Sequence, residues 1–330
     1  MPNKLEALLK PQAYPQKPPK VELIQTQMSF VFLAGDYVYK VKKPVNLGYL
    51  DYTTLEKRHF FCQQELELNR RLCSDVYLAV VPIVEDQDEL YVEGEGNAVE
   101  YAVKMRQLPQ DRMMDVLLPR GQVTPEMVTR VAEKLVNFHQ KAETNSKIAA
   151  FGNLNFVRQN TDENFVQTES YIGISITPEK YNRIKSYTDG FILANGTLFE
   201  KRVKEGRIKD CHGDLHCAHI CFTEDICIYD CIEFNDRFRY ADVASEIAFL
   251  AMDLDRYQQG DLSKHLVNTC VVLSHDEDIL KLLNFYKCYR AYVRGKVESF
   301  KLDDPYIPEE EKAKVLTVAR KYFELAESYT

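Results

Sequence analysis

Hydrophobic and polar residues alternate in short runs over the N-terminal part of the chain, and this period of two is typical of β-strands. The runs predict strands at residues 21–25, 29–33, 37–42, 77–84, 89–93 and 99–105. Ala34-Gly35-Asp36 and Gly94-Glu95-Gly96-Asn97 are short links that contain glycine, so each is expected to close a hairpin. Between the hairpins, Thr53 and Thr54 offer an N-cap for a helix over 55–73.

Beyond Leu108-Pro109 the apolar positions recur at helical spacing instead. The pattern predicts helices over about 124–142, 179–204, 242–257, 261–273, 277–300 and 308–328. Two short strands, at 220–222 and 226–229, are expected between them. The order of these elements predicts an α+β fold with two lobes.

The length agrees with two lobes, because one hydrophobic core rarely grows beyond about 250–300 residues and this chain has 330. Four prolines within 11–20 predict an extended leader over residues 1–20. Residues 21–105 are expected to form an N-terminal lobe, an antiparallel sheet with one helix. Residues 106–330 are expected to form a mostly helical C-terminal lobe, with the hinge near 105–108.

The composition indicates where in the cell the protein is located and which classes of partner it can bind. No apolar run approaches the roughly 20 residues that span a bilayer, and the N-terminus lacks the apolar segment of a signal peptide, so we expect a cytoplasmic protein without membrane contact. Nine cysteines then predict reduced thiols instead of a disulfide framework. The net charge of −8 argues against nucleic acid as a partner and mildly favours a cationic one. The oligomeric state is left open.

One window, CHGDLHCAHICFTEDICIYDC from Cys211 to Cys231, combines aspartates with many cysteines and histidines. His212-Gly213-Asp214 is followed sixteen residues later by Asp230, and Asp242 lies twelve residues further on. Two chemistries compete for this window. Phosphoryl transfer needs one carboxylate to orient or deprotonate the attacking hydroxyl and another to hold Mg²⁺, whereas a dense Cys/His set suggests zinc.

The spacing of these aspartates resembles the aminoglycoside phosphotransferase family of protein-kinase-like enzymes, whose loop reads H-G-D-x-x-x-x-N. The run DCIEFNDRFRYADVASEIAFLAMDLD further resembles an uncharacterised branch that is sometimes fused to a P-loop kinase domain, although no G-x-x-x-x-G-K-[ST] occurs here. The resemblance implies a kinase-like fold and transfer of the γ-phosphate of ATP, with Mg²⁺, to a hydroxyl of a small molecule. It implies that Asp214 acts as base, that His212 orients the loop, that Asp230 holds Mg²⁺ and that Asp242 accepts backbone amides of the loop.

The chain departs from that pattern at His219, which stands where the family has asparagine. Asparagine offers a hard oxygen to Mg²⁺, whereas imidazole prefers softer metals. Three interpretations stay open: Glu233 or a water supplies the missing oxygen, His219 binds a different metal, or catalysis is weakened.

The N-terminal part offers a second match to a kinase-like site. Tyr37-Val38-Tyr39-Lys40 falls where a V-A-I-K strand is expected, so the resemblance assigns Lys40 to the α/β-phosphates. Strand alternation puts Lys40 and Lys42 on the same face. Glu65 lies on an apolar stripe of the following helix and therefore needs a cationic partner, for which Lys40 is the first choice. In the alternative, Glu65 is a rim residue paired with Arg58 or Arg70.

The hinge and two other functions complete the predictions. Met105, Gln107 and Leu108 are expected near the adenine through their backbone groups, and the Thr26-Gln27-Met28 turn lacks the glycines of a phosphate-binding loop. A catalytically weak nucleotide-binding module is the second hypothesis. The third is a zinc-binding or redox-sensing protein, although the window does not contain two separated ligand pairs of the C-x₂₋₄-C or H-x₃₋₅-H type.

Overall fold

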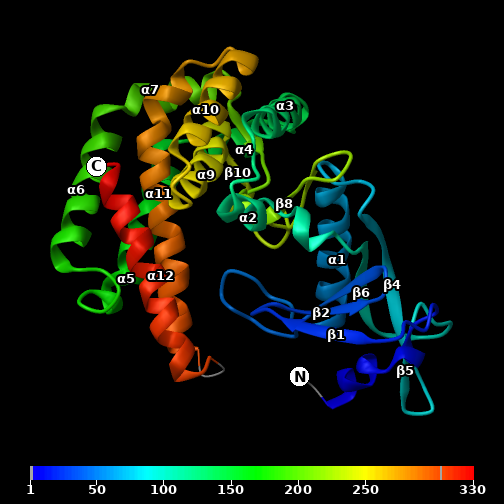
Figure 1. Cartoon of the computed structure of the whole chain (residues 1–330). Helices are drawn as coiled ribbons and strands as arrows, with labels where there is room; N and C mark the ends of the chain where they lie inside the picture. The colour runs from blue at the N-terminus through cyan, green and yellow to red at the C-terminus, as the bar shows by residue number, and fades with distance from the viewer. Residues whose placement is uncertain (1–2, 305–306) are drawn as a thin grey trace. The chain divides into compact units, whose positions relative to one another are not determined.

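The computed structural model describes residues 3–304 and 307–330, and it has an α+β architecture in two compact units (Figure 1). Unit 1 comprises the chain up to Val116 together with Ala218–Asp236, and unit 2 comprises Leu117–Cys217 and Arg237–Thr330. The segment Ala218–Asp236 thus belongs with the N-terminal sheet, although it lies far along the sequence. Within the described residues, every helix is too short or too polar to cross a bilayer.

Unit 1 is built on a six-stranded antiparallel sheet. Its strands are β1 (Val21–Gln25), β2 (Ser29–Ala34), β3 (Tyr37–Lys42), β4 (Tyr77–Asp86), β5 (Glu89–Val92) and β6 (Ala98–Arg106). They lie in the order β1-β2-β3-β6-β4-β5, which confirms the hairpin at Ala34-Gly35-Asp36. The hairpin predicted at Gly94-Glu95-Gly96-Asn97 is wrong, because β5 pairs with the preceding strand β4, and β6 pairs with β3 and β4. Because β3 has a neighbour on each side, its register is fixed, with Lys40 opposite Val103 of β6.

The N-terminal residues differ from the extended leader that the prolines predicted. They form two short 3₁₀ helices, η1 (Asn3–Leu9) and η2 (Pro11–Ala13). Leu8 and Tyr14 are almost fully buried in the same hydrophobic cluster as Phe32 of β2. Apolar burial against the sheet therefore fixes this segment, and Pro11 is compatible because it occupies a first helical position.

Helix α1 (Leu55–Arg70) packs on β4 and β6. Thr54 begins it as the N-cap, since its hydroxyl oxygen accepts a backbone N–H of the first turn. The buried positions of α1 include the polar residues Glu65 and Asn69, which need partners. Asn69 Oδ1 accepts the backbone N–H of Cys231 at 2.9 Å. Helix α1 thus holds the distant Ala218–Asp236 segment.

The helix η6 (Cys217–His219) leads into that segment, which continues with the antiparallel pair β8 (Ile220–Cys221) and β9 (Cys227–Ile228). A disulfide joins Cys73, just after α1, to Cys227. This corrects the prediction of reduced thiols for these two residues. Their Cα atoms are 4.8 Å apart, within disulfide range, and only the tertiary fold brings them together. The other seven cysteines are buried thiols.

Unit 2 is mostly helical. Its longer helices are α3 (Pro125–Lys141), α5 (Leu154–Thr168), α6 (Pro178–Ala194), α7 (Gly196–Lys204), α9 (Val243–Arg256), α10 (Gly260–Ser274), α11 (Asp278–Phe300) and α12 (Glu309–Ser328). The shorter elements of the chain are α2 (Met114–Leu117), α4 (Ser146–Ala150), α8 (Asp236–Arg239), β7 (Ile208–Asp210), β10 (Tyr240–Asp242), η3 (Gln110–Arg112), η4 (Leu118–Arg120), η5 (Glu169–Tyr171) and η7 (Lys301–Asp303).

Two features of unit 2 bear on its candidate site. The predicted helix over 179–204 is divided into α6 and α7, because Asn195 leaves the helical conformation at φ −114° and ψ 22°. Helix α9 is buried along almost its whole length and packs against α10 and α11. A helix enclosed in this way gives a rigid base for the loop that it contacts.

Candidate functional site

Two lysines of β3 contact carboxylates in the interior of unit 1. Lys40 Nζ lies 2.8 Å from Glu65 Oε1 and 2.7 Å from Asp230 Oδ1. The expected Lys40–Glu65 pair is therefore present. The rim alternative does not hold, because Arg58 pairs with another glutamate and Arg70 donates to backbone carbonyl oxygens.

Lys42, on the same face of β3, also pairs with buried carboxylates, and this pairing was not predicted from the sequence. Its Nζ donates to Glu65 Oε2 at 2.8 Å and also to Glu233 Oε1, and it lies 4.8 Å from the centre of the Tyr52 ring. The Tyr52 hydroxyl donates to the same Glu233 oxygen at 2.6 Å. The alternation of residues in β3 was the sequence signal for this role of Lys42, since it placed both lysines on one face of the strand.

We call this group of side chains the lysine–carboxylate network. It consists of Lys40, Lys42, Tyr52, Glu65, Asp230 and Glu233. Glu233, predicted as an oxygen ligand for the metal, is 8% exposed and has two hydrogen-bond donors on its Oε1. In this structure Glu233 therefore accepts hydrogen bonds from Lys42 and Tyr52 within the network.

Ionisation in the network follows from its pairing. Burial tends to lower the pKa of Lys40 and Lys42, but the nearby carboxylates raise it well above the ordinary value of a lysine. Burial tends to raise the pKa of Glu65, and the two ammonium groups outweigh that effect, so this pKa is lowered. All three groups are therefore charged at neutral pH.

Asp230 combines an unusual backbone with an accessible carboxylate. Its φ is 64°, in the left-handed region that residues with a Cβ rarely occupy. Its N–H donates to the Tyr77 hydroxyl oxygen at 3.3 Å. The side chain is 41% exposed, and Oδ2 lies 3.6 Å from Nε2 of His219. His219, at which the chain departs from the resembled motif, is thus a direct neighbour of the predicted metal ligand.

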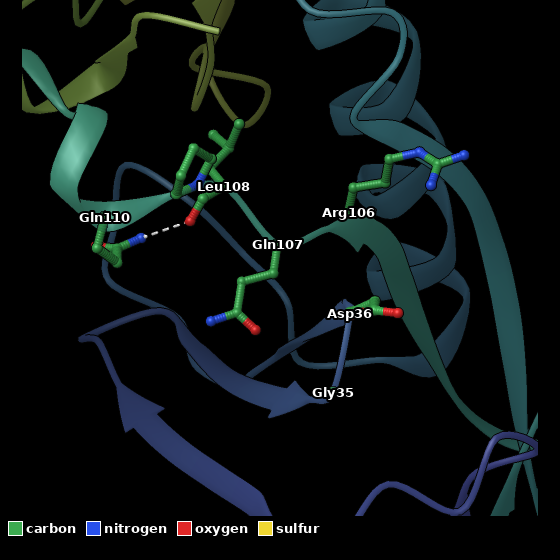
Figure 2. A pocket seen from close by; sticks show the side chains of 7 residues that line it. Gly35, Asp36, Arg106, Gln107, Leu108 and Gln110 are labelled. Carbon is green, nitrogen blue, oxygen red and sulfur yellow. Dashed lines mark hydrogen bonds between the residues drawn. The ribbon is translucent and has the colours of Figure 1, made fainter.

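The predicted hinge residues lie at the end of β6 and just beyond it. Met105 is buried, whereas Gln107 and Leu108 line an open hollow of about 430 Å³ (Figure 2). The backbone N–H of Gln107 donates to the carbonyl of Asp36 at 2.9 Å, and the carbonyl of Leu108 accepts the side-chain amide of Gln110 at 3.2 Å. An adenine ring would use other backbone groups here or displace the Gln110 side chain.

The His212-Gly213-Asp214 loop lies in unit 2 and rests on Glu246 of α9. Glu246 Oε1 accepts the backbone N–H groups of His212 and Gly213 at 2.7 and 2.8 Å. Its Oε2 lies 2.7 Å from Nε2 of His139. Two amides held by one buried carboxylate fix the path of the loop.

Asp242 was predicted in that role, and the prediction is wrong. Its Oδ1 instead accepts the N–H of Ala244 and caps α9, while the carboxylate pairs with Arg202. Glu246 lies one helical turn further along α9, so both side chains are on similar faces of the helix. The spacing from Asp230 could not distinguish between them.

The low pKa of Glu246 makes the stability of the loop sensitive to acid. Burial tends to raise the pKa of this carboxyl, but His139, His212 and the amide of Gly213 lower it to about 2. Because the folded-state pKa lies below the unfolded-state value, the carboxylate stabilises the fold at pH values above about 4.5. That contribution, about 3 kcal/mol, is lost as the pH falls from 4.5 towards 2.

Glu246→Gln is therefore expected to lower the free energy of unfolding at pH 7 and to flatten its decline below pH 4.5. Urea unfolding between pH 7 and pH 2.5 measures both effects. Glu133→Gln, an exposed change on α3, is the control and should reproduce the wild-type acid limb. An unchanged acid limb in the Glu246 variant would contradict this assignment.

Asp214 itself is held by its backbone and partly open at its side chain. Its N–H donates to Nδ1 of His212 at 3.3 Å, and Arg290 donates to the carbonyl of Gly213 at 3.0 Å. The Asp214 side chain is 32% exposed, with Oδ2 3.6 Å from Nε2 of His216. A fixed, partly accessible carboxylate suits the acceptance of a proton from a hydroxyl group.

The cysteines of the window mostly contribute to packing. All five are buried, and Cys227 is in the disulfide. Cys211 is the window cysteine that, among the described residues, lies in a group of potential metal ligands, with His139 and Glu246. Both oxygens of Glu246 already have hydrogen-bonding partners, so this group has a structural role in holding the loop.

Comparisons with known proteins agree with this architecture. No family description matches the chain. It is 32% identical over 281 residues to uncharacterized proteins of Mycobacterium bovis and Mycobacterium tuberculosis. The alignment covers 85% of this chain and 55% of each relative, so the chain spans about half the length of the curated relatives it matches.

Solved structures of small-molecule kinases are similar over nearly the whole chain. A choline/ethanolamine kinase family protein from Mesorhizobium loti superposes with a TM-score of 0.54 at 11% identity, covering 98% of both chains. Amicoumacin kinase hAmiN gives 0.54 at 12% identity, covering 98% of this chain and 92% of that one. The aminoglycoside phosphotransferase APH(2'')-Ib gives 0.50 at 14% identity, covering 98% and 99%. At these identities the likeness establishes the fold, so this chain has the two-lobed, aminoglycoside-phosphotransferase-like kinase fold.

Proposed function

We propose that this chain is an ATP-dependent phosphotransferase that moves the γ-phosphate to a hydroxyl group of a small molecule. The observation that carries the proposal is the contact of Lys40 with both Glu65 and Asp230, within a kinase-like fold. The nucleotides in similar structures support it, since amicoumacin kinase was solved with AMP-PNP and Ca²⁺ and the aminoglycoside phosphotransferase with ADP.

The surroundings of Asp230 fit a divalent cation. The carboxylate is partly exposed, and a histidine nitrogen lies beside it. Asp230 would hold Mg²⁺ through its carboxylate, and water would supply further oxygens in place of the His219 imidazole, which suits softer metals. When bound, the cation would neutralise charge on the phosphate oxygens.

Each protein group then has a defined task in the transfer. Lys40, aligned by Glu65, would bind the α/β-phosphates. Asp214 would orient the acceptor hydroxyl and take its proton while the oxygen bonds to the γ-phosphorus. The bond from that phosphorus to the bridging oxygen of ADP breaks, ADP leaves, and the proton passes from Asp214 to solvent.

The first test is binding of Mg²⁺-AMP-PNP by isothermal titration calorimetry. Wild type should bind only with the metal, and Asp230→Asn should weaken that binding by about tenfold or more. Asp86→Asn, an exposed change in unit 1, is the control and should bind like wild type. Equal affinity of the Asp230 variant and wild type would overturn the assignment.

Transfer from labelled ATP to a panel of hydroxyl acceptors then tests the reaction itself. Transfer to an acceptor supports the enzyme. Binding without transfer across the panel would favour the nucleotide-binding module, which the contact of His219 with Asp230 makes the second candidate. Absence of nucleotide binding in wild type would overturn both.

A further inference from the structure

The lysine–carboxylate network has a closed inner part and an accessible outer part. Lys42 is 1% exposed, Glu65 is 0% exposed and Glu233 is 8% exposed. The side chains of Lys40 and Asp230 are 16% and 41% exposed. The inner part therefore keeps its charges away from water, while the outer part is where a ligand can reach.

The two lysines also differ in how they engage Glu65. Lys42 makes a hydrogen bond to Oε2 at 2.8 Å. Lys40 lies at the same distance from Oε1 as an ion pair, and Oε1 is a buried oxygen without a hydrogen bond. Lys42 is thus the hydrogen-bonded partner of Glu65, and Lys40 is its ion-pair partner on the other oxygen.

We propose that Lys42 is a positioning residue, which neutralises Glu65 and Glu233 in the interior and so leaves Lys40 available to the phosphates of a nucleotide. Within the described part of the chain, Lys42 is the cation that pairs with Glu233. Without it, two buried carboxylates would compete for Lys40, since an unpaired buried charge is strongly unfavourable. This inference rests on the proposed function, because it assumes that a nucleotide binds beside Lys40.

An acyl-phosphate derivative of ATP tests the inference in the wild-type protein, with mass spectrometry as the readout. A lysine near the phosphates loses a proton to solvent and its amine attacks the acyl carbon. An amide bond forms, the acyl–phosphate bond breaks, ATP leaves and the second amine proton passes to solvent. Lys40 should be acylated at least about tenfold faster than Lys42, and added Mg²⁺-ATP should protect it. Acylation of Lys42 at a similar or higher rate would overturn the inference, because Lys42 would then face the nucleotide.

The double variant Lys42→Met/Glu233→Gln separates positioning from stability. It removes one positive and one negative charge together, so the melting temperature should stay near that of wild type. Lys40 is then the cation left for Glu65, and its acylation and the affinity for Mg²⁺-AMP-PNP should each fall about tenfold. A folded double variant with wild-type acylation of Lys40 would overturn the inference.

Two milder variants test the positioning role of Lys42 if the double variant does not fold. Lys42→Arg keeps the charge and should retain wild-type acylation of Lys40. Glu233→Gln leaves Lys42 to Glu65 alone and should not reduce that acylation, so a fall in it counts against positioning. Lys43→Met, a change of the adjacent lysine, is the matched control. If wild type shows neither protectable acylation nor binding of Mg²⁺-AMP-PNP, the proposed function itself fails, which differs from acylation at Lys42.

Discussion

Asp214→Asn is expected to keep the affinity for Mg²⁺-AMP-PNP within about twofold and to lower the rate of phosphate transfer by about 10³-fold. The amide cannot accept the proton of the acceptor hydroxyl, so the loss should appear in kcat. The loop should keep its shape, because His212, Glu246 and Arg290 hold it through backbone groups. Rapid-quench or steady-state transfer assays with labelled ATP measure the rate.

The matched control for that experiment is Asp261→Asn, which changes a fully exposed aspartate at the start of α10. It should leave the rate unchanged. A variant at Asp214 that transfers phosphate at the wild-type rate would exclude this residue as the base. Equal losses of affinity and rate would point instead to a collapsed loop.

Arg202→Met is expected to lower the free energy of unfolding by about 3–5 kcal/mol. Arg202 is completely buried, with its guanidinium paired to Asp242 at 2.6 Å and to Asp276 at 2.5 Å. Methionine fills a similar volume but leaves both carboxylates without this cation. Because Asp242 also caps α9, the damage should extend to the helix that carries Glu246.

Chemical denaturation monitored by circular dichroism measures that loss, with Arg120→Met as an exposed control. The double variant Arg202→Met/Asp276→Asn should recover part of the stability, because it removes one of the stranded charges. A loss below about 1 kcal/mol in the single variant would show that water or other cations satisfy these carboxylates.

Features encoded by local periodicity were predictable from the sequence. The strands of the first sheet followed from alternation, and the Lys40–Glu65 pair followed from a strand face and a helix stripe. Both are properties of single elements. The aspartate spacing also led to the kinase-like fold, because short loops and strands set those separations.

Features that depend on tertiary pairing were not predictable. Lys42 meets Glu233 across 191 residues, and Cys73 meets Cys227 across 154, so neither pair has a local signature. The choice between Asp242 and Glu246 failed for a different reason. Asp242 caps α9 and Glu246 lies one turn further along, and only the three-dimensional path of the loop decides which carboxylate receives its amides.

Unit 1 is assembled from two separate stretches of the chain, and this delays its folding during synthesis. After Val116 emerges from the ribosome, Asp236 follows about 120 residues later, or roughly 6–24 s at 5–20 residues per second. During that interval Lys40 and Lys42 have Glu65 but lack both Asp230 and Glu233, so the nascent unit holds an excess of positive charge where its core should close. Unit 1 therefore cannot finish folding as an independent N-terminal domain. A proteolytic cut between Val116 and Ala218 would leave its two stretches joined by noncovalent contacts and the Cys73–Cys227 bond alone.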